Sequence, residues 1–150
     1  MAPFDKISQY FTLQEAIGSA TAERRKINNY PDEATLARIA ETARKMDSVR
    51  RFLGVPIVVT SWYRSPALNK AIGSKPTSQH VKGEAVDWVA PQFGPPAHIF
   101  KRLREAGLIF DQLILEYADG YSGGWIHSSF TDAPRQQALV IDTAGARVLA

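Results

Sequence analysis

Two histidines and one aspartate are the residues in this chain whose types and spacing best suit metal chemistry. His80 and Asp87 stand on either side of Gly83, so a glycine turn can bring an imidazole and a carboxylate together. His127 comes later, in a segment whose apolar and polar residues alternate as in a strand. Two neutral imidazoles and one carboxylate suit zinc and leave its fourth tetrahedral position open for water. The sequence therefore predicts a single zinc site of the catalytic kind at His80, Asp87 and His127.

The strand that carries Asp87 supports this interpretation. Alternation from Glu84 to Val89 puts Ala85, Asp87 and Val89 on one face of the expected strand. An aspartate inside an apolar strand is costly unless it has a strong partner, and a cation meets that need. The alternative is a carboxylate that only caps a turn.

A second acidic residue can reach the same site from another strand. The segment from Gln112 to Tyr117 alternates so that Glu116 shares a face with Ile114. A glycine-rich turn then leads into a strand from Trp125 to Phe130. If the two strands pair as neighbours, Glu116 comes within range of His127.

The other expected elements form a scaffold. Apolar residues at spacings of three and four mark residues 32 to 53 as a long amphipathic helix. The β-branched run from Val55 to Thr60 predicts a largely buried strand. Further elements are expected as a short helix after the capping box Thr12-Leu-Gln-Glu15, helices over residues 66 to 73 and 95 to 106, and a closing hairpin over residues 138 to 149.

Composition indicates one ordinary globular domain spanning all 150 residues. The chain has no cysteine, which excludes disulfides and thiolate metal ligands. Its 18 basic and 15 acidic residues give a net charge of +3, and only Arg24-Arg25-Lys26 forms a basic cluster. Nucleic-acid binding would rest on this charge alone, so no nucleic-acid partner is expected. We expect a monomer without a signal peptide or membrane span, made in the cytoplasm.

Three motifs in order resemble those of the zinc D-Ala-D-Ala carboxypeptidases and phage endolysins, a peptidase family that shares its fold with the hedgehog signalling domain. They are Ser61-Trp-Tyr-Arg64-Ser-Pro, the segment from Ser78 to Asp87 with His80, Gly83 and Ala85 at fixed spacing, and Trp125-Ile-His127. The similarity is greatest to the phage-associated branch and covers nearly the whole chain.

This resemblance implies an α+β fold in which a small antiparallel sheet carries the zinc site and packs against helices. It implies zinc held by His80, Asp87 and His127, with Arg64 binding substrate or the developing oxyanion and Ser78 near the substrate's terminal region. The implied substrate is a D-amino-acid-containing stem peptide of peptidoglycan, cut by a carboxypeptidase or endopeptidase. The implied setting is the bacterial cell wall, reached after release or as part of a phage particle.

The chain departs from the family pattern at two positions. Many relatives carry the catalytic carboxylate three residues before the last histidine, where this chain has Gly124. Glu116 is therefore our candidate for the general base, with Asp119 as the nearest rival. Relatives often have glycine where this chain has Trp62, a residue that either narrows the cleft or covers the core. The loss of the acid at Gly124 keeps open a second hypothesis, a zinc-containing module that binds cell wall or protein without turnover.

Overall fold

The computed structural model describes residues 1 to 119 and 123 to 149 of the chain. These residues form two compact units, one made of Met1–Ser48 with Ser61–Val86 and the other of Val49–Thr60 with Asp87–Ala150. The expectation of a single domain stays a prediction. Helices and a mostly antiparallel six-stranded sheet make the fold α+β, as predicted. No helix within the described residues is both long and apolar enough to cross a membrane.

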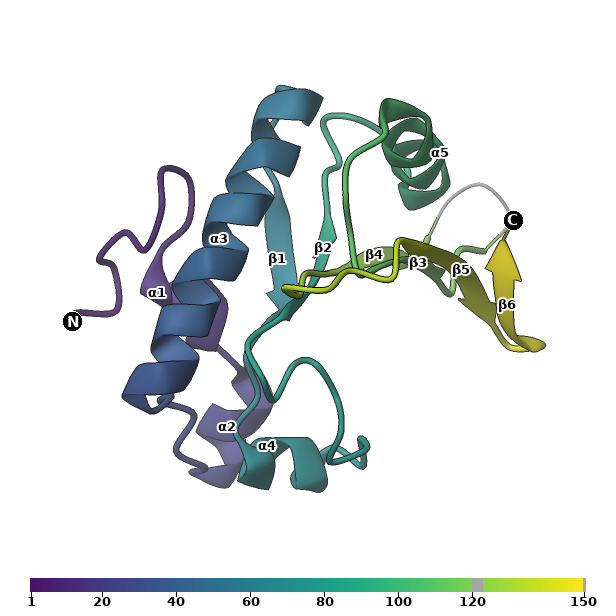
Figure 1. Ribbon diagram of the computed structural model, residues 1–150. Coiled ribbons are helices and arrows are strands. Elements are labelled where there is room, and N and C mark those ends of the chain that lie inside the picture. The colour runs from purple at the N-terminus through teal and green to yellow at the C-terminus, as the bar shows by residue number, and fades with distance from the viewer. Residues whose placement is uncertain (120–122, 150) are drawn as a thin grey trace. The chain divides into compact units, whose positions relative to one another are not determined.

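Helices dominate the first unit: α1 (Leu13–Ile17), α2 (Ala20–Arg25), most of α3 (Glu33–Leu53) and α4 (Pro66–Ala71) (Figure 1). The expected capping box is present, since the Glu15 amide donates to Thr12 Oγ1 while Glu15 Oε1 accepts from the Thr12 amide. The long amphipathic helix is confirmed, and its apolar face buries Ile39, Ala43 and Met46 completely. Helix α2, which is six residues long, was not predicted from the sequence.

A buried carboxylate on α3 fixes the N-terminal segment to the first unit. Asp47 is 4% exposed and accepts hydrogen bonds from the Ser8 hydroxyl and from the amides of Gln9 and Tyr10, at 2.9, 3.0 and 3.1 Å. A charged group this deep is stable only when its oxygens are satisfied. Asp47 therefore orders the chain that leads into α1.

The sheet and α5 (Pro96–Ala106) make up most of the second unit. Its strands are β1 (Val58–Ser61), β2 (Ala85–Val89), β3 (Gln112–Glu116), β4 (Trp125–Ser129), β5 (Gln137–Asp142) and β6 (Gly145–Leu149), in the order β1-β2-β4-β3-β5-β6. The pairs β3 with β4 and β5 with β6 are antiparallel, and β3 with β5 is parallel. Helix α5 packs on β3 and β4 through Ile99, Phe100 and Leu103, and the closing hairpin is confirmed.

The prediction that Val55 to Thr60 forms a largely buried strand was wrong. The strand begins at Val58, its residues alternate between exposed and half-buried, and Val58 is 49% exposed. The reason is its place at the edge of the sheet, where no neighbouring strand lies beyond it. A β-branched run indicates a strand but does not say whether both faces are covered.

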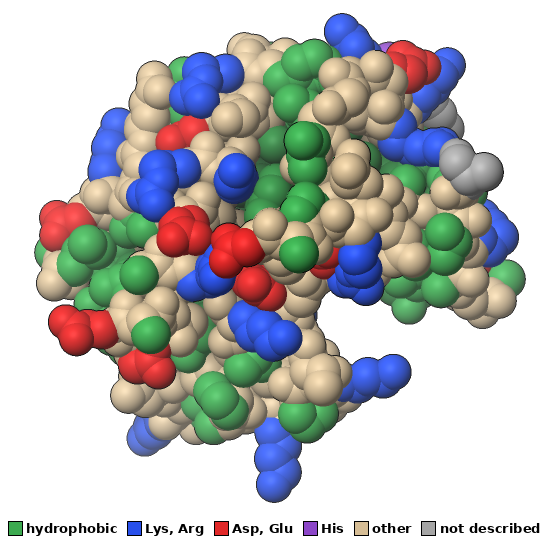
Figure 2. All heavy atoms as spheres, viewed as in Figure 1, with side chains coloured by type: hydrophobic (Ala, Val, Ile, Leu, Met, Phe, Trp, Pro, Cys, Tyr) green, Lys and Arg blue, Asp and Glu red, His purple; other side chains and the backbone are tan. Residues whose placement is uncertain are grey.

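On the face shown in Figure 2, Lys and Arg side chains are scattered, with Asp and Glu side chains among them, and do not form one continuous patch. Nucleic-acid contacts normally need a continuous basic stripe or patch. The face shown therefore offers no electrostatic argument for such a partner.

Candidate metal centre

His80 sits in a run of tight turns that its own sequence dictates. The amides of Val81 and Gly83 donate to the carbonyls of Ser78 and His80, and Gly83 has a φ of +74°. A Cβ at Gly83 would lie 2.7 Å from Ile39 Cγ1, so only glycine fits both this conformation and this space. The glycine turn expected between the two ligands is therefore confirmed, and it is seated against α3.

A backbone carbonyl orients the ring of His80. Its Nδ1 lies 2.6 Å from the carbonyl oxygen of Trp62, and the residue is 3% exposed. Because a carbonyl only accepts, Nδ1 carries the proton in this contact and Nε2 keeps its lone pair. Metal-binding histidines usually donate their other ring N–H to such an oxygen, which fixes the tautomer.

Asp87 and His127 face each other from the second unit. His127 Nδ1 lies 2.8 Å from Asp87 Oδ1, and the two side chains are 14% and 11% exposed for Asp87 and His127. β2 and β4 are neighbours in the sheet, and this contact means that both side chains lie on the same face of it. The aspartate inside an apolar strand thus has the strong partner that its burial requires.

Together the two histidines and the aspartate form a candidate metal site. Each of His80, Asp87 and His127 offers one ligand atom, and these atoms all lie within 4.8 Å of one another. Nitrogen and carboxylate donors are types that zinc accepts. The residues therefore fit a zinc ion.

Glu116 lies beside the same histidine. β3 pairs with β4 so that Ile114 faces His127 and Glu116 faces Trp125, which confirms that the two strands are neighbours. Glu116 Oε1 is 3.7 Å from His127 Nδ1, and the Glu116 side chain is 17% exposed. Asp119, the rival acid, is exposed. The geometry favours Glu116, and its role as the base stays a prediction.

Gly124 has a conformational reason to lack a side chain. Its φ is +75°, and a Cβ there would lie 2.4 Å from the carbonyl oxygen of Glu116 and 2.6 Å from the amide nitrogen of Ala118. The chain after β3 thus passes directly against Gly124. An acid cannot be carried at this position with the same backbone path, so the departure from the family pattern is built into the turn.

The two residues expected to meet substrate lie in the first unit. The Arg64 amide donates to the carbonyl of His80 at 3.1 Å, which joins the arginine segment to the histidine turn. Ser78 Oγ accepts from the His80 amide at 3.2 Å, which is the turn-forming role expected of a serine at this spacing. Their roles toward substrate stay predictions.

A buried asparagine beside Arg64 was not predicted from the sequence motifs. Asn29, 8% exposed, donates to the carbonyl of Tyr63 at 3.2 Å and accepts from the amide of Ser65 at 2.7 Å. It therefore clamps the backbone on both sides of Arg64. Only its turn context, Asn28-Asn29-Tyr30-Pro31, was visible in the sequence, and the partners lie more than thirty positions away.

Trp62 and Tyr63 belong to the core of the first unit. Trp62 is 1% exposed and meets Phe11 edge to face at a centroid distance of 5.7 Å, so its indole covers the core. Tyr63 is 6% exposed, and burial, followed by the charge of Asp32, raises the pKa of its phenol above 10.0. Neither residue presents a group suited to chemistry at neutral pH.

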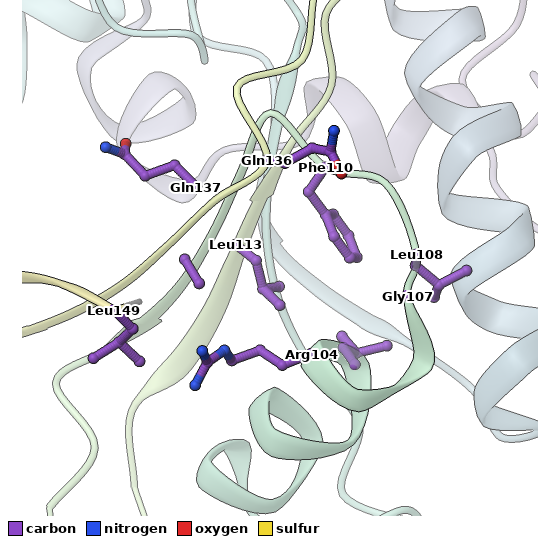
Figure 3. A pocket seen from close by; sticks show the side chains of 10 residues that line it. Arg104, Gly107, Leu108, Phe110, Leu113, Gln136, Gln137 and Leu149 are labelled. Atoms are coloured by element: carbon purple, nitrogen blue, oxygen red, sulfur yellow. The ribbon is translucent and has the colours of Figure 1, made fainter.

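A cavity of about 240 Å³ in the second unit is separate from these residues. Figure 3 shows apolar side chains around it, among them Phe110, Leu113 and Leu149, with Arg104 and Gln136 also on its walls. It contains none of the predicted site residues. His98 is exposed, and its ring lies 5.4 Å from that of Phe93, as an ordinary histidine could.

Comparison with known proteins identifies one family. A family model described as Peptidase M15 matches residues 9 to 127, a range that includes Arg64, both histidines, Asp87 and Glu116. No curated protein matches the chain.

Proposed function

Because the chain belongs to the peptidase M15 family, we propose that it is a zinc peptidase that hydrolyses D-amino-acid-containing peptide bonds in the stem peptides of bacterial peptidoglycan. The observation that carries this proposal is the convergence of His80, Asp87 and His127, with an acid beside them in Glu116. A three-ligand nitrogen and carboxylate set is the arrangement of catalytic zinc sites, whereas structural sites use four protein ligands.

In this proposal His80 through Nε2, Asp87 and His127 hold the metal. When bound, zinc would polarise the scissile carbonyl and lower the pKa of water to roughly 7. His80 needs no reorientation for this role, since the Trp62 carbonyl already fixes its ring.

Glu116 is proposed as the general base and acid. Its carboxylate takes one proton from the attacking water as the water oxygen bonds to the carbonyl carbon. The same proton then passes to the leaving nitrogen as the C–N bond breaks, which gives a carboxylic acid and an amine, and the acid then gives its proton to the amine or to solvent. Its 17% exposure leaves the carboxylate accessible while most of it is shielded from bulk water.

Arg64 is proposed to hold either a substrate carboxylate or the oxyanion that forms at the scissile carbonyl. A planar guanidinium can bind both through paired N–H donors. Clamping by Asn29 and the His80 carbonyl keeps its backbone in register with the histidine turn. Accurate orientation of a group that binds the reacting centre can raise the rate by several powers of ten.

The experiment is a digest of purified peptidoglycan by zinc-loaded protein, with mass analysis of the released products. We expect new amino and carboxyl ends within the stem peptide, and a drop of about 100-fold or more in rate for Glu116→Gln, because general acid-base catalysis contributes roughly 10² to 10⁴. Asp119→Asn is the matched control and should leave the rate within a few fold.

Gly124 favours one other candidate function, a zinc-containing module that binds cell wall or protein without turnover. That function is supported if zinc-loaded protein leaves every stem peptide intact while wild type and Glu116→Gln sediment equally well with cell-wall sacculi. The setting of phage-associated wall lysis is a further part of our proposal, supported by the family alone. Lysis of intact cells only after outside addition or membrane disruption would agree with it.

A further inference from the structure

Asn69 on α4 is a buried amide whose two ends serve two different segments of the first unit. It is 2% exposed, and its Oδ1 accepts from Arg64 Nη1 at 3.4 Å. Its Nδ2 donates to the carbonyl oxygens of Lys75 and Ser74 at 2.8 and 3.4 Å. One side chain therefore connects the guanidinium of Arg64 with the loop that leads to Ser78 and His80.

The hydrogen bonds leave only one way to orient this amide. Rotating it by half a turn would set Oδ1 against two carbonyl oxygens and Nδ2 against a guanidinium that only donates. Both contacts would be repulsive in a buried site, where unsatisfied polar groups are costly. The loop carbonyls thus force Asn69 to present its acceptor oxygen to Arg64.

Other groups already fix what surrounds Arg64. Asn29 clamps the backbone on either side of it, and the Arg64 amide is bonded to the His80 carbonyl. The ring of His80 has its own anchor in the Trp62 carbonyl. The Arg64 backbone and the His80 ring are thus held without Asn69, whose own contacts are with the Arg64 guanidinium and with the loop at Ser74 and Lys75.

Open space adjoins this contact. Asn69 forms part of the wall of a cavity of about 600 Å³ between α4 and the loop after it, with Pro66, Pro76 and Val81 as apolar walls. A ligand segment can therefore approach the residue that contacts the guanidinium. A long, flexible arginine side chain keeps one direction only where acceptors hold it, and Asn69 is one such acceptor for Arg64.

We propose that Asn69 is a positioning residue that holds the Arg64 guanidinium in the direction from which it binds the substrate carboxylate or the oxyanion. The proposal rests on the function proposed above. Asn69 itself touches no reacting atom. Its effect is on the accuracy with which Arg64 is placed, and a displacement of about 1 Å in such a group can cost roughly 100-fold in rate.

A double-mutant cycle tests this role. We expect Asn69→Ala to lower kcat/KM by about 10- to 100-fold and to change kcat and KM in the same proportion as Arg64→Ala does. In the Arg64→Ala background, Asn69→Ala should change kcat/KM by less than about threefold, because the group it positions is gone. Zinc content should stay at the wild-type level. An equal loss in both backgrounds, or loss of zinc, would overturn the proposal.

A second measurement does not depend on activity. The ¹H–¹⁵N heteronuclear NOE of Arg64 Nε–H should show an ordered side chain in wild type and a mobile one in Asn69→Ala. If wild type hydrolyses nothing, the proposed function fails, while this measurement still decides whether Asn69 orders Arg64. An unchanged NOE in Asn69→Ala would refute the positioning role.

Two further variants serve as controls for the comparison of wild type with Asn69→Ala. Asn28→Ala removes an exposed asparagine of the same unit, whose Oδ1 accepts from the Tyr30 amide, and should leave both readouts unchanged. If Asn69→Ala does not fold, Asn69→Ser replaces it, because its hydroxyl can still donate to a loop carbonyl but is too short to hold Arg64 as well. Asn69→Ser should lower kcat/KM and leave Arg64 mobile, as expected of Asn69→Ala. An ordered Arg64 and a wild-type kcat/KM in this variant would count against the proposal.

Discussion

Replacing Gly124 by alanine tests whether the turn before β4 excludes a side chain. The left-handed backbone costs alanine about 1 to 2 kcal/mol relative to glycine. The new Cβ would also lie 2.4 Å from the Glu116 carbonyl oxygen and 2.6 Å from the Ala118 nitrogen, both of them backbone atoms that cannot rotate away. Forced overlap in a packed region typically costs another 1 to 3 kcal/mol or so. We therefore expect Gly124→Ala to lower the free energy of unfolding by about 2 to 5 kcal/mol.

Gly107→Ala is the matched control. Gly107 has a φ of +72°, nearly that of Gly124, but no atom lies within 4 Å of a Cβ built there. Only the backbone cost applies, so this variant should lose about 1 to 2 kcal/mol. Urea unfolding followed by tryptophan fluorescence measures both variants under the same conditions. If Gly124→Ala is no more destabilised than Gly107→Ala, the crowding argument is refuted.

The same argument predicts the outcome of restoring the family acid. Gly124→Glu should be at least as destabilised as Gly124→Ala, because it has the same Cβ. In a Glu116→Gln background it should not restore hydrolysis, since the strain falls on the backbone of residue 116 itself. Recovery of more than about a tenth of the wild-type rate would show that the turn adapts, and that position 124 can still carry the base.

Three other predictions follow from contacts within one unit. Arg135→Ala should lower the free energy of unfolding, measured in urea, by about 1.5 to 3 kcal/mol, because it removes two charge-assisted hydrogen bonds to the buried Asp111. Arg147→Ala, which breaks an exposed ion pair, should lower it by less than about 1 kcal/mol. Equal losses in the two variants would contradict this. Because the pKa of Tyr63 is raised in the folded state, its neutral form adds stability below pH 10.0, and this stability is lost as the pH rises through the folded-state pKa. The free energy of unfolding of Tyr63→Phe should therefore fall less steeply with rising alkaline pH than that of wild type. Identical alkaline profiles of the two proteins would be evidence against it. Zinc at 100 times its Kd should stabilise wild type by about 2.7 kcal/mol and leave the melting of His127→Ala unchanged; equal shifts in a thermal melt would place the metal elsewhere.

Most of the elements could be predicted because each has a local cause. The long helix follows from its apolar spacing, α1 from the capping box at Thr12, and the neighbouring strands around His127 from alternation on each side of a glycine-rich turn. These signals depend only on residues close in the chain. The proposed ligand set combined a local pattern, His80 and Asp87 around Gly83, with a distant histidine, His127, and it stays a prediction.

What the sequence did not reveal depends on contacts between distant segments. Whether the strand at Val58 is covered on both faces is decided by its place at the sheet edge. The roles of Asn29 and Asn69 appear only when loops far apart in the chain meet, since asparagine is also common in ordinary turns. The reason for glycine at position 124 likewise lies in the path of the chain after β3.

The carbonyl that orients His80 belongs to the backbone of Trp62 and not to its indole. A substitution at position 62 therefore changes how the interior is filled without removing the oxygen that faces His80 Nδ1. Core volume and the direction of the imidazole can in this way be altered independently of each other.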